Sequence, residues 1–275
     1  MGTFRILSDL HLGHPASTIT RVPMIFPVIE GVTEVWFNGD TVETCSRVLA
    51  APSLAALGEM TGYLDGKGIR WTTLPGNHDP DRGGPALRSL ANGEIVVTHG
   101  DMCFRYGSPW SPWVPRIKDK LARAEAALGG FDNAADVAAR AKLAQAYAHA
   151  FEPRPRRFTG ALGKLETILH AAWPPTTPLA ILNVWINGPD MVAKWMEQFT
   201  PAAKILIMGH THRPGIWFRR GKWIINTGAY HPFATPRIVD YSPGKIEIRP
   251  VVRRDGRFHP GAVNRVLARG LEGWR

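Results

Sequence analysis

In the stretch Phe4-Arg5-Ile6-Leu7-Ser8-Asp9-Leu10-His11, a short apolar run ends in a carboxylate and an imidazole. Later apolar runs are also followed by polar side chains that can bind a metal ion. These later motifs are Gly39-Asp40, Gly76-Asn77-His78-Asp79, Thr98-His99-Gly100-Asp101 and Gly209-His210-Thr211-His212. Strands that alternate with helices predict a layered α/β domain. Since functional loops of such sheets gather at the carboxyl ends of the strands, we expect the motifs to meet in space.

The pattern around the motifs predicts the elements of this domain. Short β-branched or aromatic runs predict strands at 4–7, 34–37, 70–74, 94–98 and 204–208, and the segment 48–64 is predicted to be a helix. Three further runs, 223–226, 237–239 and 245–248, resemble an antiparallel tail to the sheet. We expect 1–103 and 189–250 to form one discontinuous core domain, followed by a basic C-terminal tail at 251–275.

The segment 104–188 interrupts this pattern with Ala-rich helical sequence. Helices are predicted at 117–128, at 133–151 with Asp132 as its cap, and at 160–172, before the core resumes with a short helix at 189–199. Because the segment follows directly after a metal-ligating motif, we expect a helical insertion that lies as a lid over the site.

The motifs supply carboxylate, imidazole and amide donors without a thiolate. Such oxygen and nitrogen donors suit manganese, iron, zinc or cobalt, and their number exceeds what one tetrahedral ion requires. We therefore predict two divalent ions, with manganese favoured. A pair of ions can stabilise both the attacking and the leaving oxygen in a displacement at phosphorus.

Composition narrows the class of protein. The chain has 33 Lys and Arg against 23 Asp and Glu, a net charge of +10, which favours an anionic partner such as a phosphorylated substrate, nucleic acid or an acidic membrane surface. No apolar run approaches the ~20 residues of a membrane span. Only Cys45 and Cys103 occur, so no disulfide framework is predicted. A strand pattern starts at once without a signal peptide, and we expect a cytoplasmic protein.

The five motifs, in this order, strongly resemble the signature of the calcineurin-like metallophosphoesterase superfamily. The resemblance implies an αββα sandwich of two mixed sheets. It also implies one ion held by Asp9, His11, Asp40 and His212, and a second held by Asp40, Asn77, His99 and His210. Asp40 would then bridge the ions, and a hydroxide shared by them would attack phosphorus. His78, oriented by Asp79, would stabilise the transition state or protonate the leaving oxygen.

Some neighbouring residues are weaker candidates for contact with substrate. His14 follows the first motif, Arg213 follows the last one, and His231 comes after Thr227-Gly228-Ala229, where the chain returns towards the site. His149, His170 and His259 belong to no motif, and we interpret them as structural or surface residues.

Within the superfamily, the chain looks most similar to the UDP-2,3-diacylglucosamine pyrophosphatase group of lipid A synthesis. The similarity lies in Ser8 to Leu12, in the helical insertion after His99-Gly100-Asp101, and in the segments 191–199, 209–214 and 227–231. It implies an amphiphilic, lipid-linked phosphate substrate and peripheral contact with an anionic membrane. The chain departs from that group in Gly39-Asp40-Thr41-Val42-Glu43, where the group usually has Gly-Asp followed by an aromatic or aliphatic residue and then Asp, and at His78, where it often has Arg.

Other functions remain open on the sequence. The basic charge also suits a nuclease or nucleotide phosphodiesterase, although no stripe of aromatic and basic residues for stacking bases is evident. A protein serine/threonine phosphatase would carry an Arg sooner after the Gly-Asp motif. A non-catalytic scaffold of the same fold is a minor alternative, since such relatives lose ligands and none of the seven ligand positions is substituted here.

Overall fold

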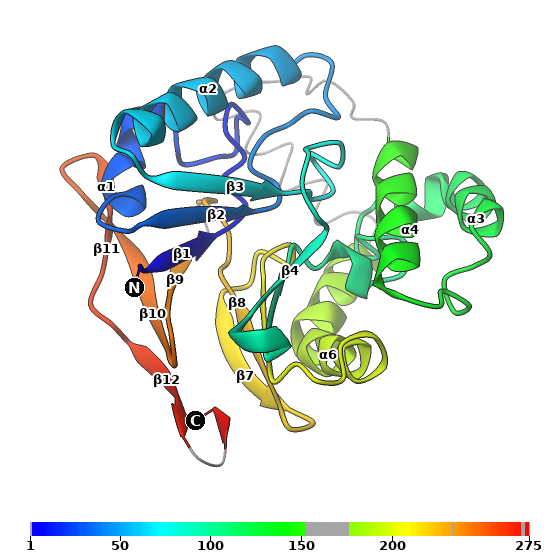
Figure 1. The fold of residues 1–275 in the computed structure, drawn as a ribbon. Helices are drawn as coiled ribbons and strands as arrows, with labels where there is room; N and C mark the ends of the chain where they lie inside the picture. The colour runs from blue at the N-terminus through cyan, green and yellow to red at the C-terminus, as the bar shows by residue number, and fades with distance from the viewer. Residues whose placement is uncertain (1, 152–175, 233, 271–272, 275) are drawn as a thin grey trace.

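Two mixed β-sheets pack face to face in the computed structural model of the chain, which describes residues 2–151, 176–232, 234–270 and 273–274 (Figure 1). The larger sheet has the order β13-β12-β10-β9-β1-β2-β3, with β11 paired to β10, and the smaller has the order β4-β5-β6-β8-β7. Their strands are β1 (Phe4–Leu7), β2 (Glu34–Asn38), β3 (Arg70–Leu74), β4 (Leu87–Leu90), β5 (Ile95–Thr98), β6 (Ile205–Met208), β7 (Gly215–Arg219), β8 (Lys222–Asn226), β9 (Arg237–Ser242), β10 (Lys245–Arg254), β11 (Arg257–Pro260), β12 (Arg265–Gly270) and β13 (Gly273–Trp274).

Helices cover the outer face of each sheet. Helices α1 (Phe26–Ile29) and α2 (Ala50–Gly66) lie on the larger sheet, and α6 (Thr176–Phe199) lies on the smaller one, next to α3 (Lys118–Ala127) and α4 (Val137–Ala150) (Figure 1). Apolar side chains of both sheets, such as Ile6, Ile95 and Ile207, fill the layer between them. The predicted αββα sandwich is therefore confirmed.

The strands that carry the motifs agree with the sequence prediction. β1, β2 and β3 pair in parallel in the larger sheet, while β5 and β6 pair in parallel in the smaller one. All four residues of β5 and of β6 are buried because layers cover both faces of that sheet. Parallel pairing directs the carboxyl ends of neighbouring strands to the same edge. The short strands β4 and β7 were not predicted.

The helices of the insertion differ from the prediction in two places. Helix α4 begins at Val137, and its cap is Asp136, whose carboxylate accepts the N–H of Ala139 at 2.8 Å, rather than Asp132. Helix α6 begins at Thr176 instead of 189 and continues through Pro189. A proline usually opens a helix, which is why the sequence suggested a start there. The helix predicted at 160–172 lies outside the described residues.

Helix α6 crosses the boundary that we expected between insertion and core. Its side chains Val184, Val192 and Met196 are buried against Leu206 and Ile224 of the smaller sheet. That sheet has an apolar outer face, and α6 buries it. Residues 176–188 of the expected insertion are thus part of the outer helical layer of the sandwich.

The C-terminal segment is also more ordered than a basic tail. Residues 251–270 contain the end of β10 and strands β11 and β12, which extend the larger sheet. Inward-facing Val251, Phe258 and Leu267 are buried, whereas arginines occupy many of the exposed positions between them. These charges concealed the strand pattern in the sequence.

The position predicted for the strand at 223–226, in an antiparallel tail with 237–239 and 245–248, was wrong. This strand, β8, pairs in parallel with β6 in the smaller sheet, whereas the other two belong to the larger sheet.

Among the residues that the structure describes, none of the helices combines the length and the hydrophobicity that crossing a bilayer would require.

A buried ion pair joins the neighbouring strands β1 and β9 inside the larger sheet, and its contribution to stability can be tested. The Arg5 guanidinium donates to both carboxylate oxygens of Asp240 at 2.7 Å, and a third N–H reaches the carbonyl of Val28 at 2.7 Å. We expect Arg5→Met to lower the free energy of unfolding by about 3–5 kcal/mol, since the buried Asp240 carboxylate loses its two-bond partner and keeps only Arg249 Nε, at 3.5 Å. Urea unfolding measures the change. The matched control is Arg70→Met, whose exposed pair with Glu34 should contribute less than about 1 kcal/mol. Equal losses in the two variants would contradict this account.

Candidate metal centre

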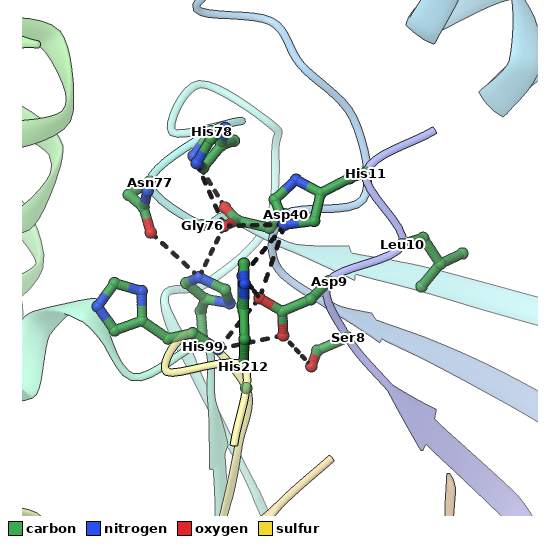
Figure 2. A network of polar contacts seen from close by, with 12 residues as sticks. Ser8, Asp9, Leu10, His11, Asp40, Gly76, Asn77, His78, His99 and His212 are labelled. Carbon is green, nitrogen blue, oxygen red and sulfur yellow. Dashed lines mark hydrogen bonds and ion pairs between the residues drawn. The ribbon is translucent and has the colours of Figure 1, made fainter. Parts of the chain in front are cut away.

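The predicted ligands lie together at the junction of the two sheets (Figure 2). Asp9 and His11 follow β1, Asp40 follows β2, Asn77 follows β3, His99 follows β5, and His210 and His212 follow β6. The loops are joined by backbone hydrogen bonds, such as that from the Asp9 N–H to the Gly39 carbonyl at 3.1 Å. The ends of five strands thus bring together residues that lie about two hundred positions apart in the sequence.

The backbone turns sharply at these residues. Asp9, His11, Asp40, His210 and His212 all have positive φ, between 48° and 68°. This left-handed conformation costs a non-glycine residue about 1–3 kcal/mol and is concentrated at functional sites. Five such residues in one cluster indicate that the surrounding fold holds the side chains where local preference would not.

Two motif glycines lie where the backbone of one loop closely approaches a side chain of another. A Cβ at Gly209 would collide with the Asp9 carboxylate and with Ser8, and a Cβ at Gly76 would collide with Asp40. At both places the backbone of one motif lies directly against a carboxylate of another. Only glycine leaves room for this contact.

Four of the predicted ligands form a first donor set. His212 Nε2 lies 3.2 Å from Asp9 Oδ1 and 3.3 Å from His11 Nε2, and His11 Nε2 lies 3.9 Å from Asp40 Oδ2. One ligand atom from each of the four residues lies within 4.8 Å of all the others. Donors that share one ion at about 2.1 Å lie roughly 3–4 Å apart, so the set fits a single divalent ion.

A second donor set shares Asp40. His99 Nε2 lies 3.3 Å from Asp40 Oδ2 and 3.3 Å from Asn77 Oδ1. The other oxygen of Asp40 accepts the backbone N–H of His78 at 2.8 Å. Oδ2 therefore faces both sets, which is the arrangement a bridging carboxylate requires.

Hydrogen bonds on the far side of each ring orient the imidazoles. His99 Nδ1 donates to the Asn38 carbonyl at 3.0 Å, and His210 Nε2 donates to the Gly107 carbonyl at 2.9 Å. These bonds leave Nε2 of His99 and Nδ1 of His210 as the nitrogens that can bind an ion. The rings of His99 and His210 lie 5.0 Å apart.

Buried negative charge dominates the electrostatics. Burial raises the pKa of Asp40, but the neighbouring His99 and His78 more than offset it and hold this pKa well below its usual range. Burial likewise raises the pKa of Asp9, but His212 and His99 outweigh burial and lower this pKa. Burial and His99 lower the pKa of His210 to about 3, so its ring is neutral and can act as a ligand. Divalent cations would match the charge of these carboxylates.

Glu43 is a residue that the sequence analysis noted only as a departure from the pyrophosphatase group. Its Oε1 lies 2.7 Å from Nδ1 of His11 and its Oε2 lies 2.8 Å from Nδ1 of His78. One buried carboxylate thus orients two imidazoles, whose Nε2 atoms both turn to the centre. Its position three residues after Asp40, in the same loop, was the available signal.

Asp79 does not orient His78 as we expected. Its carboxylate accepts backbone N–H groups of Asp40, Thr41 and Gly76 at 2.8–2.9 Å. Asp79 is fully buried, and burial together with Asp40 raises its pKa to about 6. The expectation came from its place next to His78 in the sequence, but adjacent side chains of this turn point in different directions. Asp79 ties two motif loops together.

The structure places some of the weaker candidates next to the first donor set and others away from it. The ring of His14 lies 6.0 Å from that of His11, and the ring of His231 lies 6.4 Å from that of His212, so both border the first set. Arg213 instead stacks on Trp217 at 5.2 Å, in an apolar pocket beside α6. His149 lies 3.0 Å from Asp81 and joins α4 to the loop after β3.

Comparison with known proteins agrees with this geometry. A family model for calcineurin-like phosphoesterases matches residues 2–214. A search of curated proteins finds no match.

Several solved structures are similar to the chain at low sequence identity. A dimetal phosphatase from Danio rerio is 14% identical with a TM-score of 0.46, over 90% of this chain and 95% of that one. Vacuolar protein sorting 29 from Cryptosporidium parvum is 14% identical with a TM-score of 0.44, over 94% and 96%. A predicted phosphoesterase from Streptococcus pneumoniae is 13% identical with a TM-score of 0.39, over 94% and 96%. These distant likenesses say nothing about the activity of this chain.

The double contact of Glu43 yields a prediction. We expect Glu43→Gln to weaken manganese binding about 10–100-fold, because an amide oxygen can replace only one of the two carboxylate contacts and its NH2 would face the other imidazole. Isothermal titration with Mn²⁺ measures the affinity. Glu59→Gln, an exposed change on α2, is the control and should bind like the unaltered chain. Unchanged affinity in Glu43→Gln would show that the carboxylate does not support the ligands.

Proposed function

The chain belongs to the calcineurin-like phosphoesterase family, and we propose that it is a dimetal-dependent hydrolase that cleaves a phosphoester or pyrophosphate bond. The observation that carries this proposal is the position of Asp40 Oδ2, which lies 3.3 Å from His99 Nε2 and 3.9 Å from His11 Nε2. One oxygen thus faces both donor sets. Two ions held this way would activate water and take up charge on the phosphate oxygens.

In this proposal Asp9, His11 and His212 complete the first site, and Asn77, His99 and His210 complete the second. The donors are oxygen and nitrogen atoms, which favours manganese, and iron, zinc or cobalt fit the same set. The buried positions of Asp9, His99 and His210 support the assignment, because side chains held in one orientation bind an ion without further loss of entropy.

His78 is the proposed acid that protonates the leaving oxygen. Its Nδ1 is bonded to Glu43, its Nε2 lies 4.0 Å from Asp40 Oδ2, and 39% of its side chain is exposed, so substrate can reach it. Burial lowers its pKa, but Glu43 and Asp40 outweigh burial and raise it to about 10. The ring then carries the proton that a leaving alkoxide or phosphate needs.

We further propose an amphiphilic phosphate substrate, such as UDP-2,3-diacylglucosamine, and contact with the inner face of a membrane from the cytoplasm. Three large apolar side chains on one face of α6 support this: Leu179, Leu182 and Ile186 are 67%, 51% and 63% exposed. The net charge of +10 would favour an anionic surface. The apolar pocket beside Thr211 encloses about 20 Å³, room for one or two water-sized groups. An acyl chain would therefore lie along the surface of α6.

Replacing the shared oxygen tests the dimetal proposal. We expect Asp40→Asn to lower kcat for bis-p-nitrophenyl phosphate in excess Mn²⁺ at least about a hundredfold, since the amide cannot supply a bridging negative charge. Steady-state kinetics and elemental analysis measure turnover and metal content. Asp119→Asn, an exposed change on α3, is the matched control. Near-normal turnover of Asp40→Asn would refute the dimetal assignment.

The acid role of His78 is tested through the leaving group. We expect His78→Ala to retain both ions but to lower kcat about 10²–10⁴-fold for esters with poorly acidic alcohols, and far less for a nitrophenyl ester, which needs no proton. Kinetics over a series of leaving groups, with metal analysis, measure this split. His259→Ala on β11 serves as control. A loss of metal, or an equal loss across the series, would assign His78 to a ligand or structural role instead.

A further inference from the structure

The imidazole of His210 is oriented by a different part of the chain from that of its neighbour His99. His210 Nε2 donates to the carbonyl of Gly107 at 2.9 Å, and Gly107 lies in the segment 104–113, which begins the insertion. His99 Nδ1 instead donates to the carbonyl of Asn38 in β2, a strand of the core. The second donor set therefore depends on the first residues of the insertion as well as on the core.

The turn that presents the Gly107 carbonyl has an unusual backbone. Tyr106 and Gly107 both have left-handed φ, at 65° and 66°, and the Gly107 N–H closes the turn on the carbonyl of Phe104 at 3.1 Å. The ring of Tyr106 lies 5.6 Å from that of Tyr147 in α4. A tyrosine keeps such a backbone only where its surroundings hold it. The packing of this segment thus sets the position of the carbonyl.

Two aromatic rings of the same segment pack on the imidazole itself. The ring of Trp110 lies 5.0 Å from that of His210, the ring of Phe104 lies 5.8 Å from it, and the two aromatic rings are 5.6 Å apart. Phe104 and His210 are buried, and Trp110 is partly buried against the same apolar cluster. One hydrogen bond at a corner of an imidazole fixes a direction but not the tilt of the ring, whereas packing restricts the tilt as well.

These ring contacts concern one of the two donor sets. Among the described ligand residues, His210 is the one whose ring contacts Trp110. The first set has its own support, since Glu43 Oε1 lies 2.7 Å from Nδ1 of His11. A change that loosens His210 should therefore weaken the second ion and spare the first.

We propose, on the premise that the chain holds two divalent ions as described above, that Trp110 is a positioning residue for His210 and through it sets the affinity of the second metal site. The Trp110 ring restricts rotation of the imidazole about its hydrogen bond to Gly107, which keeps Nδ1 available to the ion. Loading of the second site is then linked to the packing of the insertion.

Replacing the Trp110 ring tests the proposal. Trp110→Leu keeps an apolar side chain but removes the ring, and we expect the second Mn²⁺ to bind about 10–100-fold more weakly while the first binds as before. Trp110→Phe restores a ring and should recover the affinity to within about threefold. Trp71→Leu, at a partly buried tryptophan of β3, is the matched control and should bind both ions unchanged. Isothermal titration with Mn²⁺ measures the affinities.

Electron paramagnetic resonance separates the two sites without turnover. Two Mn²⁺ ions about 3.5–4 Å apart are spin-coupled, whereas a single ion gives its own resolved hyperfine lines. At an ion concentration that loads both sites of the unaltered chain, we expect the coupled signal in Trp110→Phe and Trp71→Leu, and the single-ion signal in Trp110→Leu.

The outcomes separate this proposal from the dimetal function. A coupled signal and unchanged affinities in Trp110→Leu would overturn the role of Trp110 and leave the dimetal function standing. Equal loss of both ions in that variant would also overturn it, because Trp110 would then act on the whole centre rather than through His210. A single-ion signal in the unaltered chain would contradict the dimetal function, and this proposal with it.

Discussion

Buried negative charge at the junction of the two sheets is the constraint on which the rest of this structure depends. Asp9, Asp40 and Glu43 are each at least 96% buried, with exposures of 0%, 1% and 4%, and they lie among imidazoles that share their hydrogen bonds. Carboxylates removed from water are stable only with positive charge close by. Histidine protons supply part of it, and the cluster of Asp9, His11, Asp40 and His212 could hold a divalent metal ion that supplies more.

The packing of the sandwich also holds the side chains of this cluster in position. Parallel strands from two sheets bring their carboxyl ends to one place, and five residues there accept a left-handed backbone. The free energy for this conformation comes from the apolar layers, in which residues such as Ile6 and Ile207 are fully buried. Asp79 adds a second fastening, because it binds backbone groups of two motif loops at once. Stability and site geometry are therefore produced by the same packing.

The described parts of the helical insertion contribute both to the stability of the core and to the geometry of the site. Helix α6 buries the outer face of the smaller sheet, and the carbonyl of Gly107 orients His210. Helix α4 is attached to the loop of Asn77 and His78 through hydrogen bonds of Gln145 and His149 to Asp81. The described parts of a segment that interrupts the core in sequence are thus packed against the core in space, next to the cluster of motif residues.

The sequence by itself determined the layered α/β fold and the seven residues that gather at the strand ends, because both are written in local patterns: apolar runs, their spacing and the motifs that follow them. Only the tertiary structure decided that Glu43 rather than Asp79 faces His78, that α6 continues through Pro189, and that the arginine-rich C-terminal segment forms strands. Each of these depends on which distant side chains meet. The direction of a turn side chain, the continuation of a helix that packs on a sheet and the pairing of an edge strand all depend on contacts with distant residues. No local sequence pattern contains these contacts.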